Sequence, residues 1–282
     1  MEQPNAEPSF ANSARALFVA SHPWPSLAIA ALVTVLAAQA APSGIGPVLT
    51  GPAMLAGQLS IGWCNDACDA LRDAAAGRTD KPVATGAVSV RAVWIAAYAS
   101  LVVALVMAAA ISVPTAVLLA MIIGAAWAYN LGLKSSLASG LAYVLGFGPL
   151  PAYAFSTLPG HPMPAWSVTA AAALVGLGGH FADVLPDLDA DRATGVAGLP
   201  QRVAARWGAG AARTCALTLL LSASALLIVA SSRLWVCVAG LAAAVVLAVI
   251  GARGAGRVPF AAAFGIAAVD VVVLAAGGFV PT

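Results

Sequence analysis

The sequence predicts an all-α polytopic membrane protein, built as a bundle of about nine transmembrane helices. Of the 282 residues, 61% are hydrophobic and only 9% are charged, and the mean hydropathy is +0.94. A soluble globular domain is about a quarter charged, so the composition excludes that class. Apolar runs of roughly twenty residues recur along almost the whole chain, and a helix of that length spans a bilayer. No polar linker divides these runs, which favours one compact bundle.

The expected spans end where Pro, Gly or charged residues interrupt the apolar runs. They lie near residues 24–41, 46–64, 91–111, 114–132, 137–156, 165–182, 212–231, 234–251 and 259–279. Residues 1–22 are expected to form a cytoplasmic tail, which carries Glu2 and Glu7, and a surface segment around Phe10 to Ala20. Residues 23–282 are then expected to form a single transmembrane domain.

The distribution of basic residues predicts the orientation of this bundle. With the N-terminus in the cytoplasm, nine spans place twelve of the thirteen Lys and Arg residues on the cytoplasmic side and only Arg233 outside. Cytoplasmic loops of membrane proteins carry an excess of Lys and Arg, so this layout is favoured and the C-terminus lies outside. The chain is rich in Ala and Gly, as genomes of high GC content encode. We therefore expect a multi-pass protein of a bacterial inner membrane.

A first acidic cluster lies in the segment "NDACDALRD", which follows the second expected span. Asn65, Asp69 and Asp73 are spaced i, i+4 and i+8, and Asp66 flanks them. If the second span continues as a helix past Asn65, these side chains form a stripe on one helix face. Carboxylates on one stripe repel each other unless a cation lies between them. Mg²⁺ is the natural candidate, because it prefers oxygen ligands and completes its coordination with water and phosphate.

A second acidic cluster lies in the segment "DVLPDLDADRATG", which follows the sixth expected span. Asp187 and Asp191 repeat the i, i+4 spacing, and Asp183 lies one turn earlier. Pro186 is poorly tolerated inside a helix but common in a first turn. The sixth span is therefore expected to end near Asp183, with a short new helix beginning at Pro186. Two facing acidic stripes could hold two or more Mg²⁺ ions and, through them, a diphosphate.

Basic residues accompany both acidic clusters. A site for a metal alone needs no cations, whereas Lys and Arg can neutralise the phosphate oxygens that metals leave free. The candidates for diphosphate binding are Arg72, Arg78, Lys81, Lys134, Arg192 and Arg202. Tyr129 precedes Lys134 and can donate a hydrogen bond or cover a cation with its ring, while His180 precedes the second cluster. Tyr129 and His180 are therefore candidates for the substrate pocket.

Several of these segments resemble motifs of the UbiA superfamily of intramembrane prenyltransferases. "NDACDALRD" matches the NDxxDxxxD signature of that family, and "DLDAD", which ends at Asp191, matches its second signature, DxxxD. "DKPVATG" resembles the family's basic-Pro-x-x-(Ser/Thr)-Gly loop, with Lys81 where Arg is common, and "YNLGLK" resembles its Tyr…Lys element. The resemblance covers the full chain, including the number of spans.

The resemblance implies a UbiA-like bundle of nine helices around a central cavity, with both Asp motifs at its cytoplasmic mouth. There the motifs bind an isoprenyl diphosphate through Mg²⁺, and a lipophilic acceptor, commonly an aromatic ring, attacks the allylic cation. The metal-binding set is then Asn65, Asp66, Asp69, Asp73, Asp183, Asp187 and Asp191, and the catalytic acids among them are Asp69, Asp73, Asp187 and Asp191. The partners are the diphosphate, a small-molecule acceptor and the lipid bilayer, and no nucleic acid is expected.

Two other functions stay open at the level of sequence. A UbiA-type terpene cyclase would act on the prenyl diphosphate alone, without an acceptor. A transporter would use the acids to bind a cation, with Asp270 in the last span as a possible relay. Against a transporter, the acids cluster at one membrane face, whereas transporter sites usually lie near the midplane. A hydrogen-bonded structural role is favoured for Asp270.

Overall fold

The computed structural model describes residues 10–40 and 44–279, and within them every regular element is a helix. Glu2 and Glu7 of the expected tail lie outside the described residues, as do residues 280–282 at the C-terminus. The helices are α1 (Phe10–Ala20), α2 (Pro23–Ala40), α3 (Ile45–Ala75), α4 (Val90–Ile111), α5 (Val113–Leu131), α6 (Ser139–Phe147), α7 (Leu150–Phe155), α8 (Trp166–Val184), α9 (Leu188–Ala193), α10 (Leu199–Trp207), α11 (Ala209–Ala230), α12 (Leu234–Arg253) and α13 (Val258–Ala276). Short 3₁₀ turns cover Leu133–Ser135 and Leu185–Asp187.

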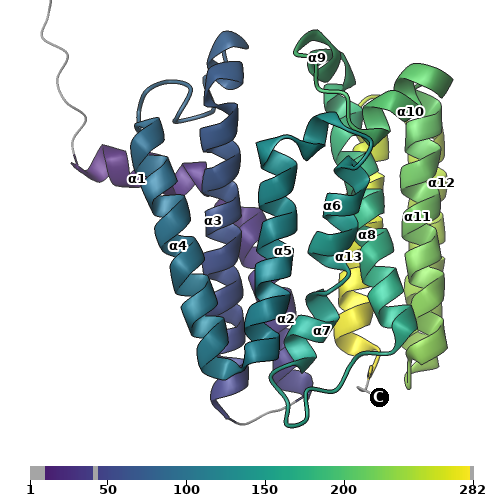
Figure 1. The fold of residues 1–282 in the computed structure, drawn as a ribbon. Coiled ribbons are helices and arrows are strands. Elements are labelled where there is room, and N and C mark those ends of the chain that lie inside the picture. Colours follow the sequence, from purple (N-terminus) through teal and green to yellow (C-terminus); the bar gives the residue numbers. More distant parts are fainter. Residues whose placement is uncertain (1–9, 41–43, 280–282) are drawn as a thin grey trace, which may run out of the picture.

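The long helices stand side by side and are roughly parallel, while α1 lies across them (Figure 1). Successive helices pack against one another from α2 to α6, then α6 packs on α8, α8 on α11, and α11 on α12 and α13. Contacts between α13 and α2 close this series into a ring. The Gln39 amide of α2 also donates a hydrogen bond of 2.5 Å to the Ala275 carbonyl of α13. The sequence-based expectation of a helical membrane bundle is therefore confirmed.

Seven of the described helices are long and apolar enough to cross a membrane, namely α2, α4, α5, α8, α11, α12 and α13. The expected span 46–64 corresponds to α3, which continues well beyond that range. The expected span 137–156 is divided into the short helices α6 and α7 at Gly148 and Pro149. Proline has no N–H to donate to the preceding turn and its ring crowds that turn, which favours a break at this point. The count of nine spans is thus not confirmed, although the class of fold is.

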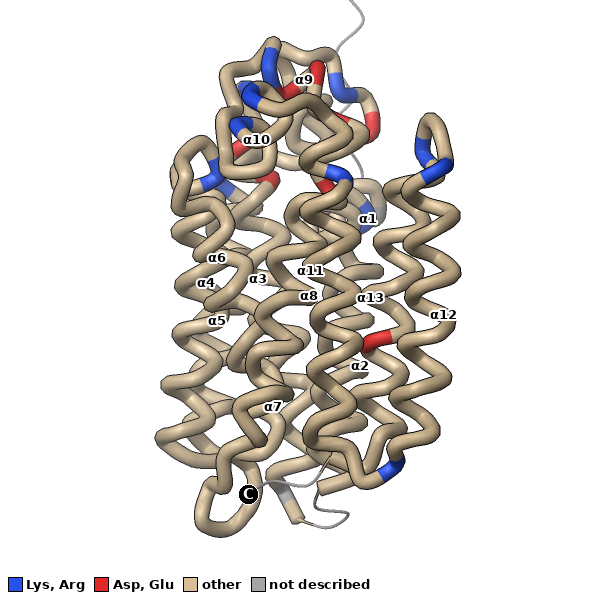
Figure 2. The backbone as a smooth tube through the Cα atoms, turned by 90° about the vertical axis from the view of Figure 1, so that its right-hand side faces the viewer, with Lys and Arg blue, Asp and Glu red and all other residues tan. Residues whose placement is uncertain are grey.

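Charged residues gather at one end of the bundle (Figure 2). Among the described residues, Asp270 within the bundle and Arg233, which bonds the Ala276 carbonyl at the opposite end, are the exceptions. Asp270 of α13 is buried, and the Ser224 hydroxyl of α11 donates a hydrogen bond of 2.5 Å to its carboxyl group. This arrangement agrees with the structural role expected for Asp270. The charged end is the one that the distribution of basic residues predicts to be cytoplasmic.

The turn between α1 and α2 packs directly on α3. Gly62 of α3 lies against the carbonyl of Ser21, and a Cβ atom at position 62 would overlap that oxygen. The Trp63 indole N–H also donates a hydrogen bond of 2.8 Å to the Leu17 carbonyl of α1. These contacts fix the position of His22, the next residue of the turn, above the end of the bundle.

We predict that Gly62→Ala destabilises the protein by about 1–3 kcal/mol, because the added methyl group overpacks the contact with Ser21. Thermal unfolding in detergent would show a lower melting temperature. Gly124→Ala is the matched control, since a Cβ atom at this position in α5 meets nothing within 4 Å. Equal melting temperatures for the two variants would contradict the proposed contact.

Candidate functional site

The first acidic cluster lies on the cytoplasmic extension of α3. This helix continues without a break to Ala75, so Asn65, Asp69 and Asp73 share one face, as the sequence predicts. The three acids of the cluster are buried, with exposed fractions of 2% for Asp66, 6% for Asp69 and 7% for Asp73. A buried carboxylate is costly unless it is paired or hydrogen-bonded. The partners of these acids therefore define the site.

Asp69 is held by two basic side chains. The Arg72 guanidinium donates to Oδ2 at 2.7 Å from one turn further along α3. The Lys134 ammonium group forms an ion pair with Oδ1, and it reaches Asp69 from the 3₁₀ turn after α5. Both bases belong to the set predicted to bind a diphosphate. The structure brings them to the same carboxylate.

Asp66 is held by a second pair of side chains. The Lys81 ammonium group lies 2.6 Å and the His22 Nε2 atom 2.7 Å from the same oxygen, Oδ1. Lys81 and His22 also lie 3.1 Å apart. The other oxygen of Asp66, Oδ2, is buried and has no partner among the described residues. Lys81 was predicted from the sequence, but His22 was not.

Asn65 is oriented by a residue that the sequence analysis did not single out. Its Nδ2 group donates to the Asn130 Oδ1 atom at 3.1 Å, and Asn130 donates in turn to the Ile61 carbonyl at 3.3 Å. Asn130 lies in the segment "YNLGLK", between Tyr129 and Lys134. In the sequence, Asn130 could have been found only through its position directly after Tyr129, a predicted pocket residue. The same segment therefore contacts both Asn65 and Asp69 of the first cluster.

The second acidic cluster surrounds the break between α8 and α9. Helix α8 ends at Val184, one residue after Asp183, and Pro186 lies in the 3₁₀ turn that leads to α9. The exposed Asp183 and Asp187 carboxylates form no hydrogen bond or ion pair with another described residue. Asp191 accepts a hydrogen bond of 2.8 Å from the Gln201 amide of α10. Among the described residues, no basic side chain forms an ion pair with this cluster.

The two clusters face each other across Tyr129. The Tyr129 hydroxyl lies within electrostatic range of Asp69 in the first cluster and of Asp183 and Asp191 in the second. Asp191 is in turn within range of Arg72 and Lys134, the two partners of Asp69. The basic side chains of the first cluster thus lie on the side that faces the second cluster.

Aromatic side chains extend from Tyr129 into the bundle. Its ring meets Tyr143 edge-on at 5.2 Å, and Tyr143 is stacked on His180 at 4.2 Å and on Phe147 at 6.2 Å.

His180 lies behind this aromatic surface. It is fully buried, and its Nε2 atom lies 3.0 Å from the Ser139 hydroxyl, which also accepts from the Leu199 N–H at 2.8 Å. These contacts join α8, α6 and α10. The position of His180 fits a role in supporting Tyr143 better than direct contact with a substrate.

The remaining predicted bases lie on the surface of the charged end. Arg78 forms two hydrogen bonds of 2.8 Å with Asp80, and this contact holds the pKa of Asp80 at about 2. The Arg202 Nε atom donates to the Ala197 carbonyl at 2.7 Å. Arg192 and Arg202 line a hollow of about 250 Å³ beside α9 and α10. None of these three arginines forms an ion pair with an acid of the first cluster among the described residues, although Arg78 lies within electrostatic range of Asp73 and Asp187.

The donor set of the two clusters fits Mg²⁺. Among the described residues, no three Asp, Glu, His or Cys side chains already lie close enough together to hold a metal ion. However, the Asp73, Asp183 and Asp187 carboxylates are not paired with a base, and the buried Oδ2 atom of Asp66 lacks a partner. These are hard oxygen donors, the kind that Mg²⁺ prefers. The match to Mg²⁺ therefore rests on the kind of donor atom, and these donors are divided between the two clusters.

We predict that Asp66→Ala releases the loop 77–88, because Lys81 anchors this loop to α3 through Asp66. Hydrogen exchange followed by mass spectrometry would show faster exchange in the loop. Asp80→Ala is the control, since Asp80 pairs only with Arg78 inside the loop. Unchanged exchange in Asp66→Ala, or an equal increase in both variants, would contradict the anchoring role.

Comparison with known proteins places this site in a family. The pattern of the UbiA prenyltransferase family matches residues 24–264. A comparison with curated protein sequences gives no match.

Solved structures share the fold. A UbiA homolog from Archaeoglobus fulgidus bound to DMAPP and Mg²⁺ superimposes with a TM-score of 0.71 at 18% identity, covering 92% of this chain and 99% of that one. A structure described for digeranylgeranylglyceryl phosphate synthase gives a TM-score of 0.71 at 11% identity, covering 94% and 98%. A UbiA homolog from Aeropyrum pernix K1 gives a TM-score of 0.66 at 18% identity, covering 92% and 98%. On the family match over most of its length, the chain belongs to the UbiA prenyltransferase family.

Proposed function

We propose that the protein is a Mg²⁺-dependent intramembrane prenyltransferase. It moves an isoprenyl group from an allylic diphosphate to a lipophilic acceptor and releases diphosphate. The observation that carries this proposal is that acids of both clusters lie within electrostatic range of Tyr129, and that Arg72 and Lys134, the partners of Asp69, lie within range of Asp191. The family match supports it, as do two structures of a UbiA homolog from Archaeoglobus fulgidus, one bound to DMAPP and Mg²⁺ and the other to GPP and Mg²⁺.

The residues that would hold Mg²⁺ lie on both sides of the site. Asn65, Asp66, Asp69 and Asp73 of the first cluster provide amide and carboxylate oxygens, and Asp183, Asp187 and Asp191 of the second provide carboxylates. Bound there, Mg²⁺ would stabilise the negative charge that develops on the diphosphate as the C–O bond breaks. The arrangement of acids on two sides suits a ligand whose phosphate groups lie between them.

Basic side chains of the first cluster would bind the phosphate oxygens. Lys134 and Arg72 both contact Asp69, and Lys81 contacts Asp66. A diphosphate competes with these carboxylates for the same donors, and charge-assisted hydrogen bonds to phosphate are strong. The ion pairs therefore hold Lys134, Arg72 and Lys81 close to where the leaving group would lie.

The aromatic surface of Tyr129 and Tyr143 would receive the isoprenyl group. Ring faces attract cations, so these side chains can stabilise an allylic cation formed when the C–O bond breaks. The surrounding apolar side chains limit the access of water, which would otherwise quench the cation. The acceptor then supplies the electron pair for the new bond and loses a proton.

The other candidate functions differ in what they require of this site. A terpene cyclase would use the same diphosphate site but no acceptor. A transporter would place its acids along the bundle, whereas the charges gather at one end (Figure 2). We further propose that this end faces the cytoplasm of a bacterial cell, with the C-terminus outside, because it carries nearly all of the basic residues.

Diphosphate release by the purified protein in lipid nanodiscs tests the proposal. Geranyl, farnesyl and geranylgeranyl diphosphate would be offered with and without Mg²⁺, and with and without a panel of aromatic acceptors. Mg²⁺-dependent release that requires an acceptor is the expected result. Release without an acceptor, with a terpene as the product, would establish the cyclase instead. Absence of both release and diphosphate binding would overturn the proposal.

We predict that Asp69→Ala and Asp187→Ala each lower turnover by at least about 100-fold, since a lost metal ligand removes several kcal/mol of transition-state stabilisation. Asp189→Ala is the matched control, because Asp189 lies in the same segment but outside the predicted metal-binding set. The Asp189→Ala variant should retain full turnover. Melting temperatures would verify that each variant is folded. A folded Asp69→Ala or Asp187→Ala variant with full turnover would remove that residue from the site.

Lys134→Ala is expected to weaken apparent affinity for the diphosphate by about 10- to 100-fold, because a hydrogen bond to a charged group contributes about 1.5–3 kcal/mol. The Michaelis constant for the diphosphate measures this effect. Arg91→Ala serves as the control, since Arg91 is an exposed base at the start of α4 and forms no ion pair with a described residue. An unchanged Michaelis constant in Lys134→Ala would exclude this lysine from diphosphate binding.

A further inference from the structure

The C-terminal half of the charged end is basic and lacks acids. Between Asp191 and Asp270 the sequence contains no Asp or Glu, whereas its basic residues at this end are Arg192, Arg202, Arg206, Arg213, Arg253 and Arg257. In contrast to the bases of the first acidic cluster, none of these arginines forms an ion pair with a described residue. The excess positive charge on this side of the bundle is therefore not neutralised within the described protein.

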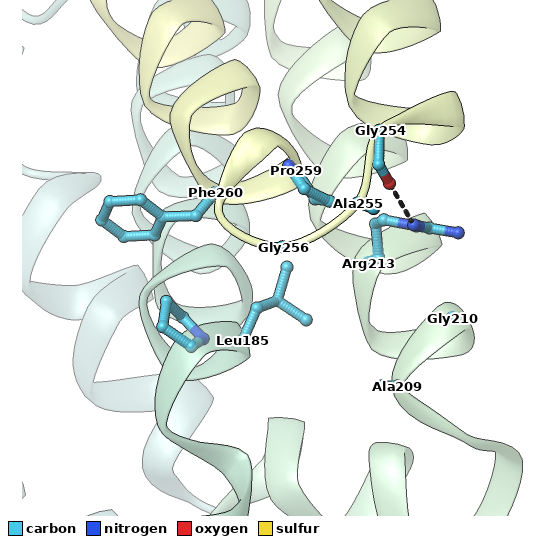
Figure 3. Close-up of a pocket in the computed structure, with 10 residues that line it drawn as sticks. Leu185, Ala209, Gly210, Arg213, Gly254, Ala255, Gly256, Pro259 and Phe260 are labelled. Atoms are coloured by element: carbon cyan, nitrogen blue, oxygen red, sulfur yellow. Dashed lines mark hydrogen bonds between the residues drawn. The ribbon is translucent and has the colours of Figure 1, made fainter.

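A pocket of about 210 Å³ lies within this basic region (Figure 3). Its walls come from the end of α8, the start of α11 and the loop between α12 and α13. Arg213 is the charged residue of the lining, and its Nη1 group donates to the Gly254 carbonyl at 3.3 Å. Its other N–H groups have no partner among the described residues, so they can donate to an anion.

Small residues leave the pocket open. Gly210, Ala255 and Gly256 contribute little side-chain volume to the lining. The backbone of Gly256 has a φ of 59°, in the left-handed region that favours glycine. A Cβ atom at Gly210 would meet nothing within 4 Å, so the space beside this residue is empty.

Backbone groups add positive potential to the same pocket. Helix α11 begins at Ala209 and α13 at Val258, and neither start is capped by a side chain. The first N–H groups of a helix lack intrahelical partners and attract anions. At α13 the Val258 N–H donates to the Ala255 carbonyl at 3.2 Å and Pro259 has no N–H, so it is the start of α11 that lies beside the other N–H groups of Arg213.

We propose that this pocket binds a phosphate group, provided by an anionic phospholipid headgroup or by free phosphate. The pocket lies at the ends of the long apolar helices α11 and α13, the level at which headgroups lie. Trp207, at the end of α10, is 66% exposed, and such residues are enriched at membrane interfaces. Basic pockets between transmembrane helices on the cytoplasmic side are known sites for anionic headgroups.

The pocket also lies next to the second acidic cluster. Any effect of the pocket on that cluster rests on the proposed function. Leu185 and Pro186 form part of its wall, and Figure 3 shows Leu185 directed toward Gly256. Asp187 directly follows Pro186 in the same 3₁₀ turn. A ligand in the pocket therefore lies behind the turn that carries Asp187 and restricts its motion.

Phospholipid retention tests the proposal without requiring turnover. The full-length protein would be purified from nanodiscs of phosphatidylcholine containing a minor fraction of phosphatidylglycerol, and bound lipid counted by native mass spectrometry. Arg213→Gln should weaken retention of phosphatidylglycerol about fivefold, which corresponds to about 1 kcal/mol for one arginine near anionic lipid. Gly210→Leu should also reduce retention, because its side chain would fill the pocket. Arg91→Gln, with the same change in net charge, should retain the lipid as the native chain does.

The outcomes separate the two sources of phosphate and the possible failures. Inorganic phosphate that stabilises the native chain but not Arg213→Gln against heat, without specific lipid retention, would assign the pocket to free phosphate. Equal loss of lipid in Arg213→Gln and Arg91→Gln would show a net-charge effect and overturn the proposal, as would equal retention in all variants. Slower hydrogen exchange in residues 183–191 on binding would support the link to Asp187. These readouts stay interpretable if no prenyl transfer is found.

Discussion

The charged end of this bundle depends on the pairing of two buried carboxylates, Asp66 and Asp69. An unpaired charge in such a position costs several kcal/mol, so each acid requires basic partners. Those partners arrive from separate parts of the chain: His22 from the turn after α1, Lys81 from the loop after α3, and Lys134 from the turn after α5. Three connecting segments are thereby drawn onto one helix face. The ion pairs of Asp66 and Asp69 therefore determine both the positions of these connecting segments and the set of side chains in the site.

The two acidic clusters differ in their ion pairing, and this difference relates the binding of the metal to that of the diphosphate. Two acids of the first cluster are neutralised by bases, whereas Asp183 and Asp187 in the second have no basic partner. In our proposal, Asp183 and Asp187 would hold a divalent cation without first losing a basic partner. Phosphate oxygens would compete with Asp69 for Lys134, and the Asp69 carboxylate that this exchange leaves free would be available to hold the metal. Binding of the metal and of the diphosphate would thus be cooperative.

The sequence was sufficient for the class of fold and for the two acidic stripes, because hydrophobic run length and i, i+4 spacing are local properties. The first stripe required the second span to continue as a helix past Asn65, and α3 does so through Asp73. The predicted interruption of the second cluster at Pro186 is confirmed. The role of His22 could not be predicted, since it depends on a left-handed turn that packs on Gly62, forty residues away. The contacts of Asn130 and Gln201 likewise depend on tertiary packing. The break between α6 and α7 could not be predicted from hydrophobicity, because apolar residues continue on both sides of it.

Binding of geranyl diphosphate to the protein in nanodiscs, measured by isothermal titration calorimetry with and without Mg²⁺, tests the central claim most directly. If the paired acids and bases form a site for a metal-bound diphosphate, saturable binding appears only when Mg²⁺ is present. Comparison with Asp69→Ala and Asp189→Ala then locates the binding, which should be lost only in the first. Binding of equal strength without Mg²⁺, or in Asp69→Ala, would contradict the account.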